Sequence, residues 1–367
     1  MRLRRARTLV VTFASGAPLL QNYMSRQSLP VDMFTLDILA RAEDWQSADA
    51  FPHLYPGTAP SVVDHYVQGL VEHGYLCVEH SPAAKLDEEY ESSWNWDTVA
   101  GLYHFGIQDP PWLDTQQNAE WMNELYVSKP PIPLMMSNEG LEDITPLERP
   151  NLDTGIMATM SARRSVRSFK PDPVPLEALR DCLFAGLGIT GFLNTQLPGE
   201  NPYLPLKMTP SGGGRNPYEG FVYVSRVDNL APGIYHYSAL DNSLGLVTDA
   251  PAAKPSQLFA QQPWTDEAAF GILLVANFER MSWKYPHPNA YRVVLMEAGH
   301  IGQNITLAAA EHSLSSTPTG ATFDSVAQSL LGLNKIKQAL VYAIFVGAGD
   351  PGAFELENYA AHPQTDD

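Results

Sequence analysis

Three arginines surround one serine in the segment SARRSVRSF. They are Arg163, Arg164 and Arg167, and the serine is Ser165. The chain holds only 23 lysines and arginines against 41 aspartates and glutamates, so this cluster stands out. Guanidinium groups and a hydroxyl form charge-assisted hydrogen bonds to phosphate, and the pattern indicates an anion site. The alternative is a solvated charge run that pairs with the acidic surface.

A glycine-rich loop, PSGGGRNP, occupies residues 210–217. Its three consecutive glycines would let backbone N–H groups approach a planar ring or an anion, and Ser211 adds a hydroxyl. The loop lacks the GxGxxG spacing and opens no evident βαβ helix, so it does not support a dinucleotide-binding Rossmann fold. An ordinary flexible loop is the alternative.

The remaining polar residues do not predict a metal site. Cys77 and Cys182 lie far apart, with no CxxC or Cys/His cluster, so we expect neither a disulfide framework nor a zinc site. Glu297, His300 and Asn304 share one face of a predicted helix. We interpret these three residues as a buried polar network.

Length and charge limit the class of protein. A chain of 367 residues predicts about two domains, and its net charge of −18 repels nucleic acid and anionic membranes. The chain has no apolar run of about 18 residues, so no membrane span is expected. The start imitates a secretory signal, but its apolar core is too short. Together with the cysteine usage, this predicts a cytoplasmic protein.

The elements that must position these residues begin with a predicted small domain over residues 1–95. We expect a strand over 8–14, helices over 19–26, 32–42 and 61–73, and a strand over 75–78. This order is similar to a winged helix. The third helix carries no lysine or arginine, which favours a peptide or protein partner over DNA.

A connector over residues 96–150 is predicted next. A helix over 83–105 leads into it, with Trp94, Trp96 and Tyr103 as aromatic anchors. The stretch 128–150 is proline-rich, and because proline breaks helices we expect an extended connector and the main domain boundary there.

Residues 151–367 are predicted to form an α+β domain, with helices around a sheet built mainly from hairpins. Helices are expected over 154–164, 175–186 and 289–314. Strands are expected over 220–227, 233–237, 244–247, 270–278 and 340–346. The apolar runs 270–278 and 340–346 should be buried strands.

The ordered set of motifs resembles the SagB-type azoline dehydrogenases of the nitroreductase superfamily. The set consists of RRSVRSF, PSGGGRNP, EGFVYVSRV, PGIYHY, the Lys284-Tyr285 pair, YRVVLMEAGHIGQNITLAA and STPTGATF, over about residues 155–349. The resemblance implies a nitroreductase-like fold with helices around a mainly antiparallel sheet. It also implies an FMN cofactor and an obligate homodimer with flavin sites at the subunit interface.

The resemblance further implies roles for single residues. Arg163, Arg164 and Ser165 would hold the FMN phosphate and ribityl chain, and Arg167 would stabilise the reduced ring. Gly320 would border one edge of the ring with backbone N–H groups. The partner subunit would supply a second group of ring neighbours, Pro210, Ser211 and Gly213.

One departure from the family pattern concerns the phosphate. Many nitroreductases end with basic residues that clasp it, but this chain has no lysine or arginine after Lys337. Either Arg163, Arg164 and Arg215 suffice, or FMN binding is weak.

The candidate catalytic residues are Lys284 and Tyr285. Azoline oxidation needs loss of a carbon-bound proton and transfer of a hydride, and a phenolate next to an ammonium can act as the base. Tyr285 is the expected base and Lys284 its electrostatic partner. The alternative is a loop whose aromatic residues only pack. Arg280 and Arg292 are expected to position the substrate backbone or to form an ion pair with Glu297.

The predicted function is FMN-dependent oxidation of azolines, or of a related peptidyl group, in peptide natural-product maturation, with O2 as final acceptor. The N-terminal domain would bind the precursor peptide or a cyclodehydratase partner. Two alternatives stay open: an NAD(P)H-dependent nitroreductase, and a non-catalytic scaffold in a synthetase complex.

Overall fold

The computed structural model describes residues 1–14, 16–128, 152, 154–194 and 203–349. Its largest element is a six-stranded sheet in the order β11-β10-β9-β12-β14-β13, with every neighbouring pair antiparallel. The strands are β9 (Tyr218–Val224), β10 (Gly233–Ser238), β11 (Ser243–Thr248), β12 (Phe270–Asn277), β13 (Ser315–Thr319) and β14 (Gln338–Gly347).

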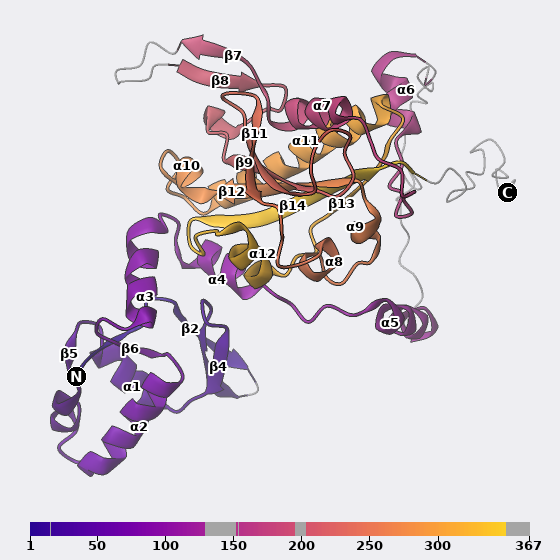
Figure 1. Cartoon of the computed structure of the whole chain (residues 1–367). Coiled ribbons are helices and arrows are strands. Elements are labelled where there is room, and N and C mark those ends of the chain that lie inside the picture. The colour runs from indigo at the N-terminus through magenta and orange to yellow at the C-terminus, as the bar shows by residue number, and fades with distance from the viewer. Residues whose placement is uncertain (15, 129–151, 153, 195–202, 350–367) are drawn as a thin grey trace, which may run out of the picture.

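Helices cover both faces of this sheet (Figure 1). On one face, α7 (Leu176–Leu187) and α11 (Asn289–Glu311) pack on alternate residues of the central strands, including Ile272 and Ile344. On the other face, α8 (Pro255–Leu258), α9 (Trp264–Glu267) and α12 (Asp324–Leu331) pack against the intervening residues, including Leu273 and Phe345. The predicted α+β arrangement is confirmed, and β12 is apolar up to its last residue, Asn277, because both of its faces are buried.

Three strands of this domain escape the sequence analysis. The hairpin of β7 (Ile189–Asn194) and β8 (Tyr203–Lys207) projects beyond the sheet (Figure 1), and β13 is largely polar. Two further helices complete the domain: α6 (Gly155–Ala162), which contacts α11, and α10 (Phe278–Ser282) after β12.

The N-terminal region contains two small sheets. One has the order β5-β1-β6, from Gln46–Ser47, Arg2–Arg5 and Leu76–Val78. The other has the order β2-β3-β4, from Leu9–Ala14, Ala17–Asn22 and Gln27–Pro30. The helices are α1 (Met33–Arg41) and α2 (Pro60–Glu72), with short 3-10 turns η1 (Ala48–Ala50) and η2 (Pro52–Leu54) between them.

The helix predicted over 19–26 is wrong. Its first residues form β3, which pairs with β2 on one side and β4 on the other, and Arg26 takes a positive φ of 60° in the turn that follows. Backbone pairing on both sides outweighs the local preference for helix. The predicted winged-helix arrangement relied on three α-helices, of which two form, so it stays a prediction.

The helix predicted over 83–105 is divided in two, α3 (Pro82–Ser93) and α4 (Thr98–Gly106). Asp97 begins the second helix by accepting a hydrogen bond from the backbone N–H of Val99. Trp94 and Trp96 between the two helices are buried in the core, as expected, whereas Tyr103 is exposed. Helix α5 (Thr115–Ser128) follows, and nearly all of the predicted proline-rich connector lies outside the described residues.

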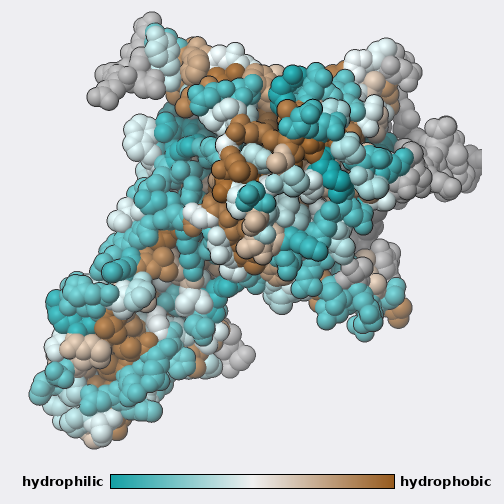
Figure 2. All heavy atoms as spheres, viewed as in Figure 1, coloured by the Kyte–Doolittle hydropathy of each residue, from teal (hydrophilic) through white to brown (hydrophobic). Residues whose placement is uncertain are grey.

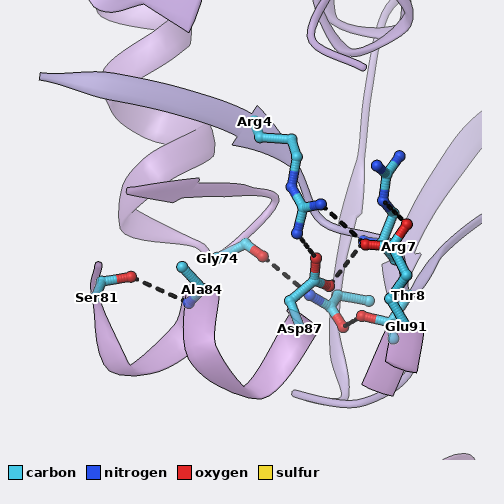
Figure 3. A network of polar contacts seen from close by, with 9 residues as sticks. Arg4, Arg7, Thr8, Gly74, Ser81, Ala84, Asp87 and Glu91 are labelled. Atoms are coloured by element: carbon cyan, nitrogen blue, oxygen red, sulfur yellow. Dashed lines mark hydrogen bonds and ion pairs between the residues drawn. The ribbon is translucent and has the colours of Figure 1, made fainter. Parts of the chain in front are cut away.

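A buried ion pair ties the N-terminal strand to α3 (Figure 3). The guanidinium of Arg4 donates to Asp87 at 2.7 Å, and the backbone N–H of Arg7 donates to the other oxygen of Asp87 at 2.8 Å. Both charged side chains are almost fully buried, and burial raises the pKa of Asp87 despite the nearby arginines. The pair therefore fixes β1 on α3.

The surface is mixed in character. On the face shown in Figure 2, hydrophobic residues gather over the sheet-bearing body and at a second place in the N-terminal region, among hydrophilic surroundings. Among the described helices, none has the length and apolar content that crossing a bilayer requires.

Candidate functional site

The arginine cluster begins where α6 ends. Arg163 follows the helix directly, and its guanidinium donates to the hydroxyl of Ser165 at 3.4 Å. Arg164 donates to the carbonyl oxygens of Ser161 and of Arg163, at 2.6 and 2.7 Å. Of the ion pairs formed between described residues, none involves Arg163, Arg164 or Arg167. These cations are therefore available to an anion.

The segment after Arg164 runs beside β13. Ser165 forms a parallel bridge with Ser316, and the hydroxyl of Thr317 donates to the carbonyl of Val166 at 2.5 Å. Gly320 comes directly after β13, so Ser165 and Gly320 lie at the two ends of one strand, about 13 Å apart at the usual rise per residue. The structure thus places Ser165, a predicted neighbour of the FMN phosphate, and Gly320, a predicted neighbour of the flavin ring, along the same strand.

Arg167 points elsewhere in this chain. It is exposed, and its guanidinium carbon lies 5.9 Å from the ring centroid of Trp264.

The glycine loop forms a short turn, η3 (Gly212–Gly214), held by a buried glutamate of α11. The hydroxyl of Ser211 donates to Oε2 of Glu297 at 2.8 Å, and the backbone N–H of Gly212 donates to the same oxygen at 3.3 Å. Glu297 is 4% exposed, and burial raises the pKa of its carboxyl while the two donors and Lys207 oppose the shift. Pro210, the first residue of the loop, is exposed.

The predicted polar network on α11 is only partly present. Glu297 is buried, and the side-chain amide of Asn304 donates to the carbonyl of Ala185 and to the hydroxyl of Thr209, each at 3.1 Å. His300 is exposed, because its position turns toward the outer side of the helix. The spacing of Glu297, His300 and Asn304 correctly indicated one side of the helix, but it could not show which of the three side chains neighbouring elements would bury.

The Lys284-Tyr285 pair lies against the glycine loop, although it is about seventy residues away in the chain. The ammonium of Lys284 donates to the carbonyl of Gly213 at 3.4 Å and lies 5.4 Å from the ring centroid of Tyr285. A Cβ atom on Gly213 would be 2.3 Å from the hydroxyl oxygen of Tyr285. The indole N–H of Trp96 donates to the carbonyl of Tyr285 at 3.0 Å, so the junction between α3 and α4 supports the pair.

The other predicted arginines have different environments. Arg215 donates to the carbonyl of Arg280 at 2.7 Å and stacks on Trp283, with 4.6 Å between its guanidinium carbon and the ring centroid. Arg280 donates to the carbonyl of Asn216 at 3.0 Å and pairs with Glu219, a residue that the sequence analysis missed. Arg292 is exposed on α11.

The expected ion pair with Glu297 is therefore not formed by Arg280. That guanidinium is occupied by Glu219, and Glu297 instead accepts the two hydrogen bonds of the glycine loop. Lys207, also missed, lies close enough to both carboxylates to interact with them, and burial lowers the pKa of its ammonium.

The predicted site residues form two clusters on opposite sides of α11. A Cβ atom on Gly212 would meet Val293 at 2.7 Å, and Glu297 anchors the same loop. Leu295, by contrast, lines a cavity of about 440 Å³ together with Gly320. Positions two residues apart point about 200° apart around a helix. One chain alone does not bring the glycine loop next to Gly320.

A metal centre finds no support in the described part of the chain. Among those residues, no group of three or more histidine, cysteine, aspartate or glutamate side chains is placed to hold an ion. Cys77 and Cys182 are both buried and free, and burial raises the pKa of their thiols, to about 11 and about 12.

Comparison with known proteins places this domain in a family. The model of the nitroreductase family matches residues 160–348, just over half of the chain. A Methanocaldococcus jannaschii protein named as a nitroreductase, MJ1384, is 31% identical over 189 residues, which are 50% of this chain and 86% of that protein. The trifolitoxin-processing protein TfxB of Rhizobium leguminosarum bv. trifolii is 26% identical over 181 residues. This match covers 48% of each chain, so this chain spans about half the length of TfxB.

Solved structures give lower similarity. A nitroreductase from Ralstonia eutropha has a TM-score of 0.44 and 22% identity, covering 56% of this chain and 88% of that one. A chain of the Escherichia coli microcin synthetase McbBCD complex, solved with truncated pro-MccB17, has a TM-score of 0.40 and 19% identity, covering 65% and 95%.

Proposed function

Because the chain belongs to the nitroreductase family, we propose that it is an FMN-dependent oxidoreductase that acts on a peptide. Members of this family are FMN-dependent oxidoreductases. The proposed reaction is oxidation of an azoline, or of a related peptidyl group, to the unsaturated product, with O2 as final electron acceptor. The observation that carries the proposal is the Lys284-Tyr285 pair seated on the glycine loop, and the name of TfxB supports a peptide as substrate.

The residues present fit FMN. Arg163, Arg164 and Ser165 offer cations and a hydroxyl suited to a phosphate, and the absence of a side chain at Gly213 lets the Tyr285 hydroxyl approach the loop backbone. When bound, FMN would accept the hydride that leaves the substrate. Arg215, which the sequence analysis offered as a further phosphate ligand, stacks on Trp283 instead, so Arg163 and Arg164 would carry that role.

Tyr285 would take the carbon-bound proton of the substrate. Its hydroxyl lies over Gly213, where the planar ring is expected, and the Lys284 ammonium beside it would stabilise the phenolate. The hydrogen bond from Trp96 to the carbonyl of Tyr285 would hold this pair in place. Arg292 remains a candidate for positioning the substrate backbone, whereas Arg280 is committed to Glu219 and would support the loop.

A homodimer would complete the site. Along α11, Arg292, Met296, Gly299, His300 and Gln303 form an exposed stripe between the side that holds the glycine loop and the side that holds Gly320. Two such stripes packed across a two-fold axis would bring the glycine loop of one subunit beside Gly320 of the other. Exposed apolar side chains of α6 and of β7 would enlarge the interface: Ile156, Met157, Met160, Phe192 and Leu193.

The N-terminal region would bind the precursor peptide or a cyclodehydratase partner. A cavity of about 470 Å³ lies between β4 and the two helices α1 and α2, and its lining includes Asp32, His65 and Tyr66 but no lysine or arginine. Within the described residues β4 pairs only with β3, so its other edge is open to an extended chain. The lack of basic residues disfavours nucleic acid here.

The test uses the full-length protein and a peptide that contains one thiazoline. We expect a yellow protein that removes two hydrogens per ring, as seen by mass spectrometry, and Tyr285→Phe should reduce turnover at least a hundredfold with FMN still bound. Arg163→Ala should release FMN, whereas Arg180→Ala, on the surface of α7, should not. A colourless protein that FMN cannot reconstitute would overturn the enzymatic proposal. Flavin reduction by NADPH without peptide oxidation would favour the general nitroreductase.

A further inference from the structure

The cavity beside Gly320 has a wall that comes from outside the nitroreductase match. Tyr103 on α4, and Ile107 and Trp112 just after it, line one side, and Tyr291, Leu295 and Gly320 line the other. The family model begins at residue 160, so the first wall is an addition to the domain that the family shares. At about 440 Å³ the cavity has the size of a small-molecule site.

The mouth of this cavity is apolar and exposed. Tyr103 and Ile107 are each 52% exposed, and Trp112 is 41% exposed, although all three are large hydrophobic side chains from one short segment. The indole N–H of Trp112 donates to the carbonyl of Thr322 at 3.2 Å, which fixes its ring at the cavity. Clustered apolar side chains at a cavity mouth mark a binding site, and no lysine or arginine lines this one. The lining does include Asp324, so an anionic guest is disfavoured.

A chain of hydrogen bonds ends inside the cavity. The side-chain amide nitrogen of Gln108 lies 3.1 Å from Nε2 of His104, and Nδ1 of His104 lies 2.8 Å from the hydroxyl of Tyr291. Burial lowers the pKa of His104 to about 3, so the imidazole is neutral and carries a single proton. Because the Gln108 amide donates to Nε2, that proton is on Nδ1 and is donated to the Tyr291 oxygen.

This arrangement leaves the proton of the Tyr291 hydroxyl free. Burial raises the pKa of Tyr291, so the hydroxyl stays protonated and can donate to an acceptor in the cavity. A guest that matches these walls is a flat uncharged ring with a hydrogen-bond acceptor, such as the ring nitrogen of an azoline.

We propose that this cavity, between α4 and α11 beside Gly320, binds the heterocycle of the peptide substrate, with Trp112 and Ile107 against the ring and the Tyr291 hydroxyl donating to its nitrogen. The inference rests on the proposed function, because it is that function which puts FMN at Gly320. It makes the segment after α4 the part of the chain that selects the substrate.

Product binding tests the site independently of turnover. The probe is a short blocked peptide that contains one thiazole, and its affinity for the FMN-loaded protein is measured by equilibrium dialysis. Tyr291→Phe removes the hydroxyl but keeps the ring, and Trp112→Ala removes one wall. We expect each to weaken binding about tenfold with unchanged FMN content. Trp121→Ala is the matched control, because Trp121 is similarly exposed on α5, and it should bind as the unaltered chain does.

The outcomes separate this site from the proposed function. Binding unchanged in both Tyr291→Phe and Trp112→Ala overturns the cavity proposal, even if the protein oxidises thiazolines. Weakened binding in both variants supports it, even if no oxidation is seen, in which case the proposed reaction fails. If Tyr291→Phe lowers the melting temperature, Trp112→Ala alone decides, since its side chain lies at the surface of the cavity.

Discussion

The contact between the glycine loop and the Lys284-Tyr285 pair depends on residue 213 having no side chain. Gly213 has a positive φ of 60°, in the left-handed region, and the space that a Cβ atom would fill there is taken by the hydroxyl of Tyr285. Glycine is thus required twice at this position, for its backbone conformation and for the contact. The same loop carries the carbonyl that accepts from Lys284, so loop and pair form one unit.

A comparison of Gly213→Ala with Gly214→Ala separates the effect of backbone conformation from the effect of the contact with Tyr285. Gly214 also has a positive φ, of 66°, but its Cβ atom would meet only Leu204, at 3.4 Å. Both changes should cost about 1 kcal/mol of stability through backbone strain. Only Gly213→Ala should also displace Tyr285 and reduce azoline turnover at least tenfold. Melting temperatures and turnover of the two variants check this, and equal turnover would show that Tyr285 does not act at this loop.

At the scale of elements, the first turn of α12 holds a buried carboxyl. Asp324 accepts a hydrogen bond from the backbone N–H of Asp109 at 3.2 Å, and Arg26 pairs with Asp109 at the same distance. Burial raises the pKa of Asp324 from 3.8 to about 6. The N-terminal region, the segment after α4 and α12 therefore meet at a group that titrates near neutrality.

Asp324→Asn should change the pH dependence of stability. The unfolded chain loses this proton near pH 3.8 and the folded chain near pH 6, so ionisation of Asp324 removes stability as the pH rises through this window. The variant carries no such charge. Its stability relative to the unaltered chain should therefore rise by about 2 kcal/mol between pH 4 and pH 6 and then stay constant. Thermal unfolding across this range measures it, with the exposed Asp44→Asn as control; parallel curves would contradict the assignment.

Elements with strong local patterns were predictable from the sequence. The apolar run of β12 and the long α11 formed where expected, because burial on both faces and helical spacing leave clear signals. Segments whose state depends on a distant partner were not predictable. The residues of β3 were expected to begin a helix. The polar β13 was not expected at all, because it forms a strand only by pairing with β14 and with the segment at Ser165.

The site divides in the same way. Residue types and spacing identified the arginine cluster, the glycine loop and the Lys284-Tyr285 pair. They could not indicate that Glu297 anchors the loop or that Glu219 occupies Arg280, because those contacts join elements that only the folded sheet brings together. The available signal was Glu297 itself, because a carboxylate on a largely apolar helix needs a hydrogen-bond partner when it is buried. Its partners, Ser211 and Gly212, lie in another segment of the chain.

At the scale of the whole molecule, the arginine cluster lies in a strongly acidic protein. The net charge of −18 leaves acidic residues in excess, yet Arg163, Arg164 and Arg167 form no ion pair with another described residue. An anion bound at this cluster would gain from local charge against an unfavourable overall field. Gly320 and the glycine loop lie on opposite sides of α11, so the proposed flavin site would need a second subunit to bring them together.

Met296→Asp tests whether a second subunit supplies the other half. Met296 is 54% exposed at the centre of the stripe on α11, and a carboxylate there would be buried without a partner in a two-fold interface. We expect analytical ultracentrifugation to give the dimer mass for the unaltered chain and the monomer mass for the variant. The variant should also lose FMN, because in the proposed homodimer each flavin site is built from residues of both subunits.

Leu240→Asp is the matched control for this change. Leu240 is 80% exposed in the turn between β10 and β11 and is not part of the stripe on α11, so its variant should stay dimeric and keep FMN. The two readouts belong together because, in the proposed homodimer, the flavin site lies at the subunit interface. A Met296→Asp protein that is monomeric yet binds FMN as tightly as the unaltered chain would show that one subunit holds the flavin by itself, and the glycine loop would then need another role.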